Sequence, residues 1–201
     1  MCAFFEASVQ EHACAILRRC FIASHASASH LLKVALSRLF GDDWVQELMN
    51  IVGEECLWII RRKPDGPWDV YIVFDVLQSV LQRLLEHSGW KSSADPQRLR
   101  QCDTLVRDVQ FVWITRNWWV HRRVSIEEAC TACESLGDTL VALRLMLGSD
   151  ASGAADCTSD IQDALKLLRS ASATVKWQVD GVCRDATWVL RAARGGACHR
   201  A

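Results

Sequence analysis

Residues 116–121 read Arg-Asn-Trp-Trp-Val-His, and they end a long stretch with helical periodicity. The apolar residues of this stretch share one side of a helix; they are Leu105, Val109, Val112, Trp113, Trp119 and Val120. At about 100° per residue, Arg116 lies within about 20° of Leu105, in the middle of that apolar side. An unpaired buried cation is very costly. The sequence therefore predicts one of two arrangements: Arg116 pairs with a buried acid such as Asp75 or Asp138, or it meets an anion in a cleft.

His121 follows Arg116 by five residues, which on a straight helix is a rotation of about 140°. The two side chains then converge only if the helix ends or kinks near Trp119, or if a second copy of the chain completes the site. A helix end fits the sequence, because residues 125–128, Ser-Ile-Glu-Glu, have the pattern of a capping box that begins a new helix. We expect His121 at a helix–helix corner that water reaches, where a simple solvated histidine is the alternative.

The rest of the chain is rich in helical patterns and poor in helix breakers, with three prolines and ten glycines. Helical patterns cover residues 3–23, 27–40, 69–87 and 125–147, and Asp95-Pro96 opens a long helix that leads to Arg116. Residues 42–44 open a further short helix, residues 56–62 fit either a helix end or a short strand, and residues 63–67 have the composition of a turn. Long helices joined by short loops predict an all-α, antiparallel helical bundle.

The 201 residues fit one domain, or one domain with a small appendage, and half of them are hydrophobic, enough for a sizeable core. We expect residues 1–40 to form N-terminal helices that pack on the bundle and residues 41–148 to form its core. The small, polar stretch 149–158 is predicted as a linker. Residues 159–195 are predicted as an additional C-terminal helical segment that either packs on the bundle or binds a protein partner.

The overall charge is close to neutral, with a formal net charge of −1 and a pI near 6.6, so the chain as a whole has no strong field for nucleic acid or membrane. Locally the balance differs, because the segment 98–123 carries six arginines against Asp103 and Asp108. This cationic strip suffices for a few phosphate contacts.

The ten cysteines have no framework spacing, which indicates free thiols in a reducing compartment, the cytoplasm or nucleus. No secretory signal is expected, because Glu6, Glu11 and His12 interrupt the apolar start. The longest apolar run, residues 70–81, is broken by polar side chains, so no transmembrane helix is expected.

No metal site or other cofactor is expected. Cys130 and Cys133 have the Cys-x-x-Cys spacing but lie inside a predicted helix, without a second ligand pair. A tetrahedral zinc site needs four ligands, so two buried small residues is the better interpretation. His25 and His30 are likewise isolated in the sequence from any plausible partner set.

The arrangement Arg116-Asn117-x-Trp119-x-His121, after a long helix and before a capped one, resembles the HEPN superfamily. Active members of these all-helical domains carry an Arg-x(4–6)-His motif. The most similar branch accompanies PIN-type nucleases in messenger-RNA quality control, where Arg-Asn-x-Trp-Ala-His is typical. Residues 41–44 and 88–90 also resemble that branch, and the likeness covers residues 41–147. Val120 stands where the family usually has a small residue.

The resemblance implies a HEPN-like bundle that cleaves RNA without a metal. His121 would act as base on a ribose 2′-hydroxyl or as acid toward the leaving 5′-oxygen, since an imidazole titrates near neutral pH. Arg116 would hold the scissile phosphate and stabilise its developing charge. Asn117 would orient the histidine or bind a phosphate oxygen. The family's common homodimer, with two motifs facing one another, is a further implication.

The remaining candidates concern RNA binding. Arg107, Arg122 and Arg123 supply charge for phosphates, although the last two are equally explained as solvated side chains. Trp119 offers a surface on which bases stack, or alternatively a packing anchor. A non-catalytic RNA-binding, dimerisation or protein-interaction module is the alternative to a ribonuclease, and its protein partner would bind through the C-terminal helix.

Overall fold

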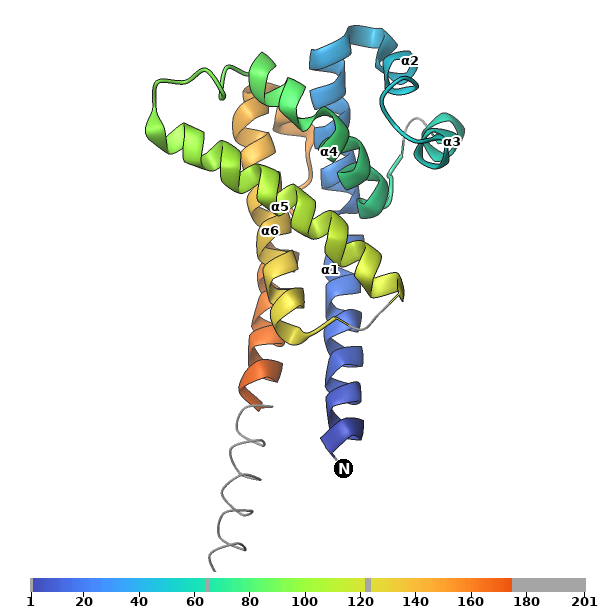
Figure 1. Cartoon of the computed structure of the whole chain (residues 1–201), viewed down its shortest axis with the longest axis vertical. Coiled ribbons are helices and arrows are strands. Elements are labelled where there is room, and N and C mark those ends of the chain that lie inside the picture. Colours follow the sequence, from blue (N-terminus) through green and yellow to red (C-terminus); the bar gives the residue numbers. More distant parts are fainter. Residues whose placement is uncertain (1, 64–65, 122–123, 175–201) are drawn as a thin grey trace, which may run out of the picture.

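The computed structural model describes residues 2–63, 66–121 and 124–174 of the chain. Across these ranges the chain forms helices and loops without a β-strand, which confirms the predicted all-α class. Figure 1 shows the order of the elements along the chain. They are α1 (Cys2–Phe40), η1 (Gly41–Asp43), α2 (Trp44–Leu48), α3 (Glu54–Arg62), α4 (Val70–His87), α5 (Pro96–His121), α6 (Ile126–Leu147) and η2 (Gly148–Gly153). A further helix covers residues 158–174.

Helix α1 is a single helix of 39 residues, so the prediction of two helices with a joint at residues 24–26 is wrong. The serine in that stretch is satisfied within the helix, because the Ser24 hydroxyl donates to the Cys20 carbonyl at 2.9 Å. No glycine or proline follows before residue 41. At 1.5 Å per residue such a helix is about 58 Å long, and its N-terminal part extends past α5 (Figure 1).

The helix boundaries follow the local sequence signals. At the start of α6, Ser125 Oγ accepts from Glu128 N at 3.1 Å and Glu128 Oε2 accepts from Ser125 N at 2.8 Å, which confirms the capping box. Helix α6 ends at Gly148, whose φ of 58° is unfavourable for residues with a Cβ. The ambiguous segment 56–62 is helical, within α3.

The four long helices form the core. Helix α1 packs against α4 and α6, and α5 packs against the same two helices. The consecutive helices α4, α5 and α6 alternate in direction (Figure 1). Helix α1 runs in the same direction as α6, because Arg38 near its C-terminal end meets the last residues of α6. The largest fully buried side chains include Trp68, Phe21 and Phe74, which belong to the α4 entrance, α1 and α4.

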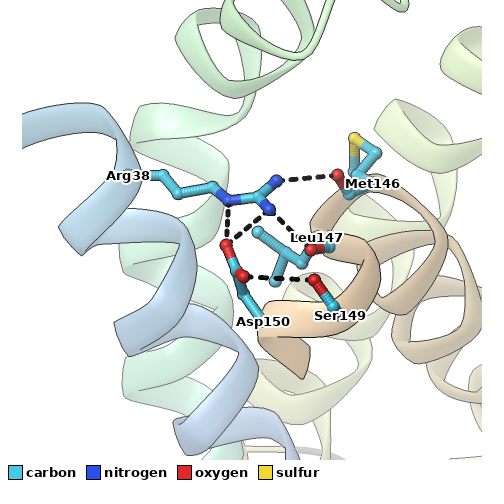
Figure 2. A network of polar contacts seen from close by, with 5 residues as sticks. All are labelled: Arg38, Met146, Leu147, Ser149 and Asp150. Atoms are coloured by element: carbon cyan, nitrogen blue, oxygen red, sulfur yellow. Dashed lines mark hydrogen bonds and ion pairs between the residues drawn. The ribbon is translucent and has the colours of Figure 1, made fainter. Parts of the chain in front are cut away.

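The C-terminal ends of α1 and α6 are joined by the guanidinium group of Arg38 (Figure 2). Its Nη1 and Nη2 donate to the carbonyls of Met146 at 3.0 Å and Leu147 at 2.7 Å, and its Nε donates to Asp150 Oδ2 at 2.8 Å. The last carbonyls of a helix have no partner inside it. Arg38 therefore caps α6 and holds the following turn.

The stretch 149–158, predicted as a linker, includes most of η2, and two of its residues, Ala151 and Cys157, are buried. The helix of residues 158–174 then lies against α6. Its Ile161, Ala164, Leu165 and Leu168 are buried, and Arg169 Nη2 lies 2.8 Å from Glu134 Oε1 of α6. The rest of the predicted C-terminal segment, from residue 175, lies outside the described residues.

Candidate functional site around Arg116

Arg116 lies on α5, and its side chain is 20% exposed. Its Nε is 3.6 Å from Asp69 Oδ1, and its guanidinium carbon is 5.3 Å from the ring centre of Tyr71. An arginine over an aromatic ring gains a cation–π attraction. The carboxylate itself is 45% exposed. The guanidinium is therefore held by an acid and a ring at a corner that water reaches, which combines features of both sequence-based alternatives.

Asp75 and Asp138, the two acids named from the sequence, have other neighbours. Asp75 accepts from the Trp113 indole Nε1 at 3.0 Å and from the Cys56 thiol at 3.1 Å. It lies one helical turn after Tyr71, and Trp113 lies one turn before Arg116. Because α4 and α5 run antiparallel, the contact between Asp75 and Trp113 lies one helical turn away from the contact between Tyr71 and Arg116, in the same interface. Asp138 lines a separate groove between α5 and α6.

Asp69 has two roles at this corner. Its Oδ1 accepts from Tyr71 N at 2.8 Å, which caps the N-terminus of α4, and the same oxygen faces Arg116. The preceding residue, Trp68, is fixed to α1, because its backbone N–H donates to Ser29 Oγ at 2.7 Å. Its indole is 1% exposed. A buried anchor and a helix cap therefore set the position of the carboxylate.

His25 of α1, which the sequence isolates from any metal-ligand set, interacts electrostatically with Asp69 and Arg116. Burial lowers the pKa of its imidazole, the charge of Asp69 raises it, and the charge of Arg116 lowers it. The net effect is a pKa below the usual value of 6.5, so His25 is neutral at pH 7. The sequence held no local signal for this electrostatic interaction, because Asp69 and Arg116 are 44 and 91 residues away along the chain.

Helix α5 runs without a break to its last residue, His121, two residues past Trp119, so no kink brings positions 116 and 121 to one side of the helix. The stretch contains neither proline nor glycine to stop it. On a continuous helix, position 121 is rotated by about 140° from position 116 and lies about 7.5 Å further along. The side chains of Trp119 and His121, and residues Arg122 and Arg123, lie outside the described part of the structure.

Two further candidate residues of α5, Asn117 and Arg107, lie at different distances from Arg116. Asn117 is half-buried and follows Arg116 on α5. Arg107 is exposed; nine residues earlier on the helix, it lies about 14 Å away along the axis and on the opposite side. Its charge lowers the pKa of Asp108, although burial raises that pKa more strongly. Arg107 is therefore not brought to the same face as Arg116.

The Asp108 carboxylate lines a groove of about 310 Å³ between α5 and α6, together with Trp90, Arg100 and Asp138. It is buried and accepts from the Ser135 hydroxyl at 3.0 Å. This groove is formed by the α5 stretch that precedes Asp108 and by the C-terminal half of α6, whereas Arg116 faces α4.

The Cys-x-x-Cys pair of α6 is divided between two environments. Cys133 is buried, and a hydrogen bond with the Cys20 thiol of α1, followed by burial, raises its pKa. Cys130 is half-buried, and burial raises its pKa. Both thiols are therefore protonated at neutral pH. Among the residues that the structure describes, no group of three or more His, Cys, Asp or Glu side chains is arranged to hold a metal ion.

None of the described helices is both long and apolar enough to cross a membrane. No protein-family model, curated protein or solved structure matches this chain. Residues 116–121 and the side chains that surround Arg116 are therefore the features of this chain that point to a function.

Proposed function

We propose that this chain is a HEPN-type, metal-independent endoribonuclease in which Arg116 holds the scissile phosphate. The observation that carries the proposal is the guanidinium of α5 beside the start of α4, 20% exposed and 3.6 Å from a half-exposed carboxylate. A contact of that length to an acid that water reaches is weak. An RNA phosphate, which offers bidentate, charge-assisted hydrogen bonds, replaces it at little cost.

The neighbouring groups suit this role. The Tyr71 ring packs against the guanidinium and restricts its side chain, so less side-chain freedom is lost when the phosphate binds. Asn117 is the next residue and contributes an amide for a phosphate oxygen or for the histidine. The free thiols fit a reducing compartment, so we place the activity in the cytoplasm or nucleus.

His121 supplies the imidazole of the motif, and its position favours a homodimer. Because α5 is helical through His121, one chain presents positions 116 and 121 on different sides of the helix. A second copy that faces the first brings the His121 of one chain to the Arg116 of the other. This arrangement is the one that the resemblance to the HEPN superfamily implies.

The test is cleavage of a single-stranded RNA, labelled at both ends, in buffer with EDTA. We expect Arg116→Gln and His121→Gln each to lower the cleavage rate by about 100- to 1,000-fold, the range for loss of one transition-state group. Arg116→Lys is the matched control, because it keeps the charge but loses the planar fork. Mixing Arg116→Gln with His121→Gln restores about a quarter of the wild-type activity if each site is shared between two chains. Half of the dimers then contain both variants, and one of the two sites in each of these is intact.

The ion pair itself favours a second candidate, a non-catalytic RNA-binding or protein-interaction module in which Arg116 and Asp69 only join α5 to α4. In that case wild-type protein shifts RNA in a gel without any product, both with and without divalent metal. Absence of RNA binding even at low salt, where electrostatic binding is strongest, favours the protein-interaction form of this candidate.

A further inference from the structure

A second imidazole, that of His25 on α1, interacts electrostatically with Asp69 and Arg116. Residues 25, 29 and 33 are four positions apart, so they follow one face of that helix. The two later members contact the α4 entrance: Ser29 Oγ accepts from Trp68 N at 2.7 Å, and Lys33 Nζ lies 5.0 Å from the Trp68 ring. His25 is one turn before Ser29 on this face, and Asp69 is the residue after Trp68. This face of α1 therefore places His25 on the side of the helix that packs against the start of α4, where Asp69 lies beside Arg116.

The charges acting on His25 define its protonation state. Among the described residues, they are Asp69 at the start of α4 and Arg116 of α5, and they oppose one another. Burial is the larger influence and lowers the pKa. His25 is therefore a neutral imidazole at pH 7, half-buried and beside a cation, and a neutral imidazole accepts a proton.

Metal-free RNA cleavage moves two protons. A base removes the proton of the ribose 2′-hydroxyl, the O2′–P bond forms and the P–O5′ bond breaks with its electron pair. An acid then protonates the leaving O5′, which gives a 2′,3′-cyclic phosphate and a 5′-hydroxyl. One imidazole does not supply both transfers in a concerted step. The motif that ends α5 contains one imidazole, His121.

We propose that His25 is the general base that removes the 2′-hydroxyl proton, which leaves His121 to protonate O5′. The proposal rests on the ribonuclease function proposed above. Arg116 holds the phosphate on which both proton transfers act, and burial of His25, to which the charge of Arg116 adds, keeps the base unprotonated. His25 and Arg116 belong to one chain, so this half of the site needs no second copy.

The kinetic test compares His25→Gln with His30→Gln, a matched control on the same helix. His30 is also half-buried but its ring packs against Gly153 of η2, away from Arg116. We expect His25→Gln to lower kcat/KM by about 100- to 10,000-fold and to abolish the rise of the rate with pH on the acid side. His30→Gln is expected to keep the wild-type kcat/KM and the rise of the rate with pH on the acid side. Circular dichroism checks that each variant folds.

The outcomes separate the two proposals. If wild type cleaves RNA, His121→Gln does not, and His25→Gln keeps its rate and its acid limb, the assignment of His25 is wrong and the ribonuclease stands. If wild type cleaves no RNA, both proposals are wrong.

A second measurement needs no RNA. In an NMR titration of the free protein, Asp69→Asn is expected to lower the pKa of His25 and Arg116→Gln to raise it, because each removes one opposing charge. If neither substitution moves the His25 titration, the shared corner does not exist and the assignment is overturned.

Discussion

Replacing Asp69 separates the two roles of its carboxylate. Asn caps a helix about as well as Asp, so Asp69→Asn keeps an acceptor for Tyr71 N–H, which Asp69 holds at 2.8 Å, and removes only the charge. Asp69→Ala removes both. The comparison therefore measures the cap and the charge independently.

The magnitudes follow from the geometry. The contact with Arg116 is 3.6 Å long and the carboxylate is 45% exposed, so the ion pair contributes about 0–1 kcal/mol. A negative charge at a helix N-terminus adds about 0.3–1 kcal/mol. We expect Asp69→Asn to lower the free energy of unfolding by about 0.5–1.5 kcal/mol. Loss of the cap costs about 1 kcal/mol more in Asp69→Ala.

Urea unfolding followed by circular dichroism, at low salt and at about 1 M salt, is the assay. Salt screens the charge but not the cap, so Asp69→Asn approaches wild type at high salt while Asp69→Ala stays about 1 kcal/mol less stable. Equal losses for both variants, or a loss in Asp69→Asn that salt leaves unchanged, would refute the assignment of the two roles.

Three other substitutions, the first with a control, test the fold. Arg38→Met leaves the last carbonyls of α6 without this donor and should lower the free energy of unfolding in urea by about 1–2 kcal/mol. Its control, Arg169→Met, removes an exposed ion pair and should lower it by less than about 1 kcal/mol. Equal losses of stability in the two variants contradict the capping role of Arg38. Ser125→Ala removes the capping box of α6 and should cost about 1 kcal/mol; an unchanged unfolding midpoint argues against it. Burial raises the pKa of Asp108, so the folded state binds its proton more tightly and loses stability as pH rises above the usual value near 3.8. Asp108→Asn should therefore gain stability relative to wild type at pH 7 and lose that gain at pH 3 in thermal melts; a gain that is larger at pH 3 contradicts the account.

Local signals in the sequence were sufficient for most helix boundaries. Ser125 with Glu128, Gly148, and Asp95 before Pro96 each act within one turn of the chain, so the sequence pattern predicts them directly. The break predicted between the helices of residues 3–23 and 27–40 is wrong, because it was also inferred from the local sequence alone. A serine is a weak helix former, but here its hydroxyl is satisfied one turn back and the residue is buried in the core.

The candidate site was only partly accessible from the sequence. The position of Arg116 on the apolar side of its helix predicted that it needs a partner, and the structure supplies Asp69. Which acid it would be depends on how α4 docks on α5, a tertiary contact that no local pattern encodes. His25 was missed for the same reason, because α1 meets this corner through Trp68, far along the chain.

The most direct test of the central claim, that Arg116 binds an RNA phosphate at this corner, is the salt dependence of RNA affinity. Fluorescence anisotropy with a labelled single-stranded RNA would compare wild type with Arg116→Gln from about 20 to 200 mM salt. Each lost phosphate contact lowers the slope of log K against log salt by about 0.7 for single strands, so we predict a shallower slope by that amount and weaker binding at low salt. An unchanged slope and affinity in Arg116→Gln would contradict the claim.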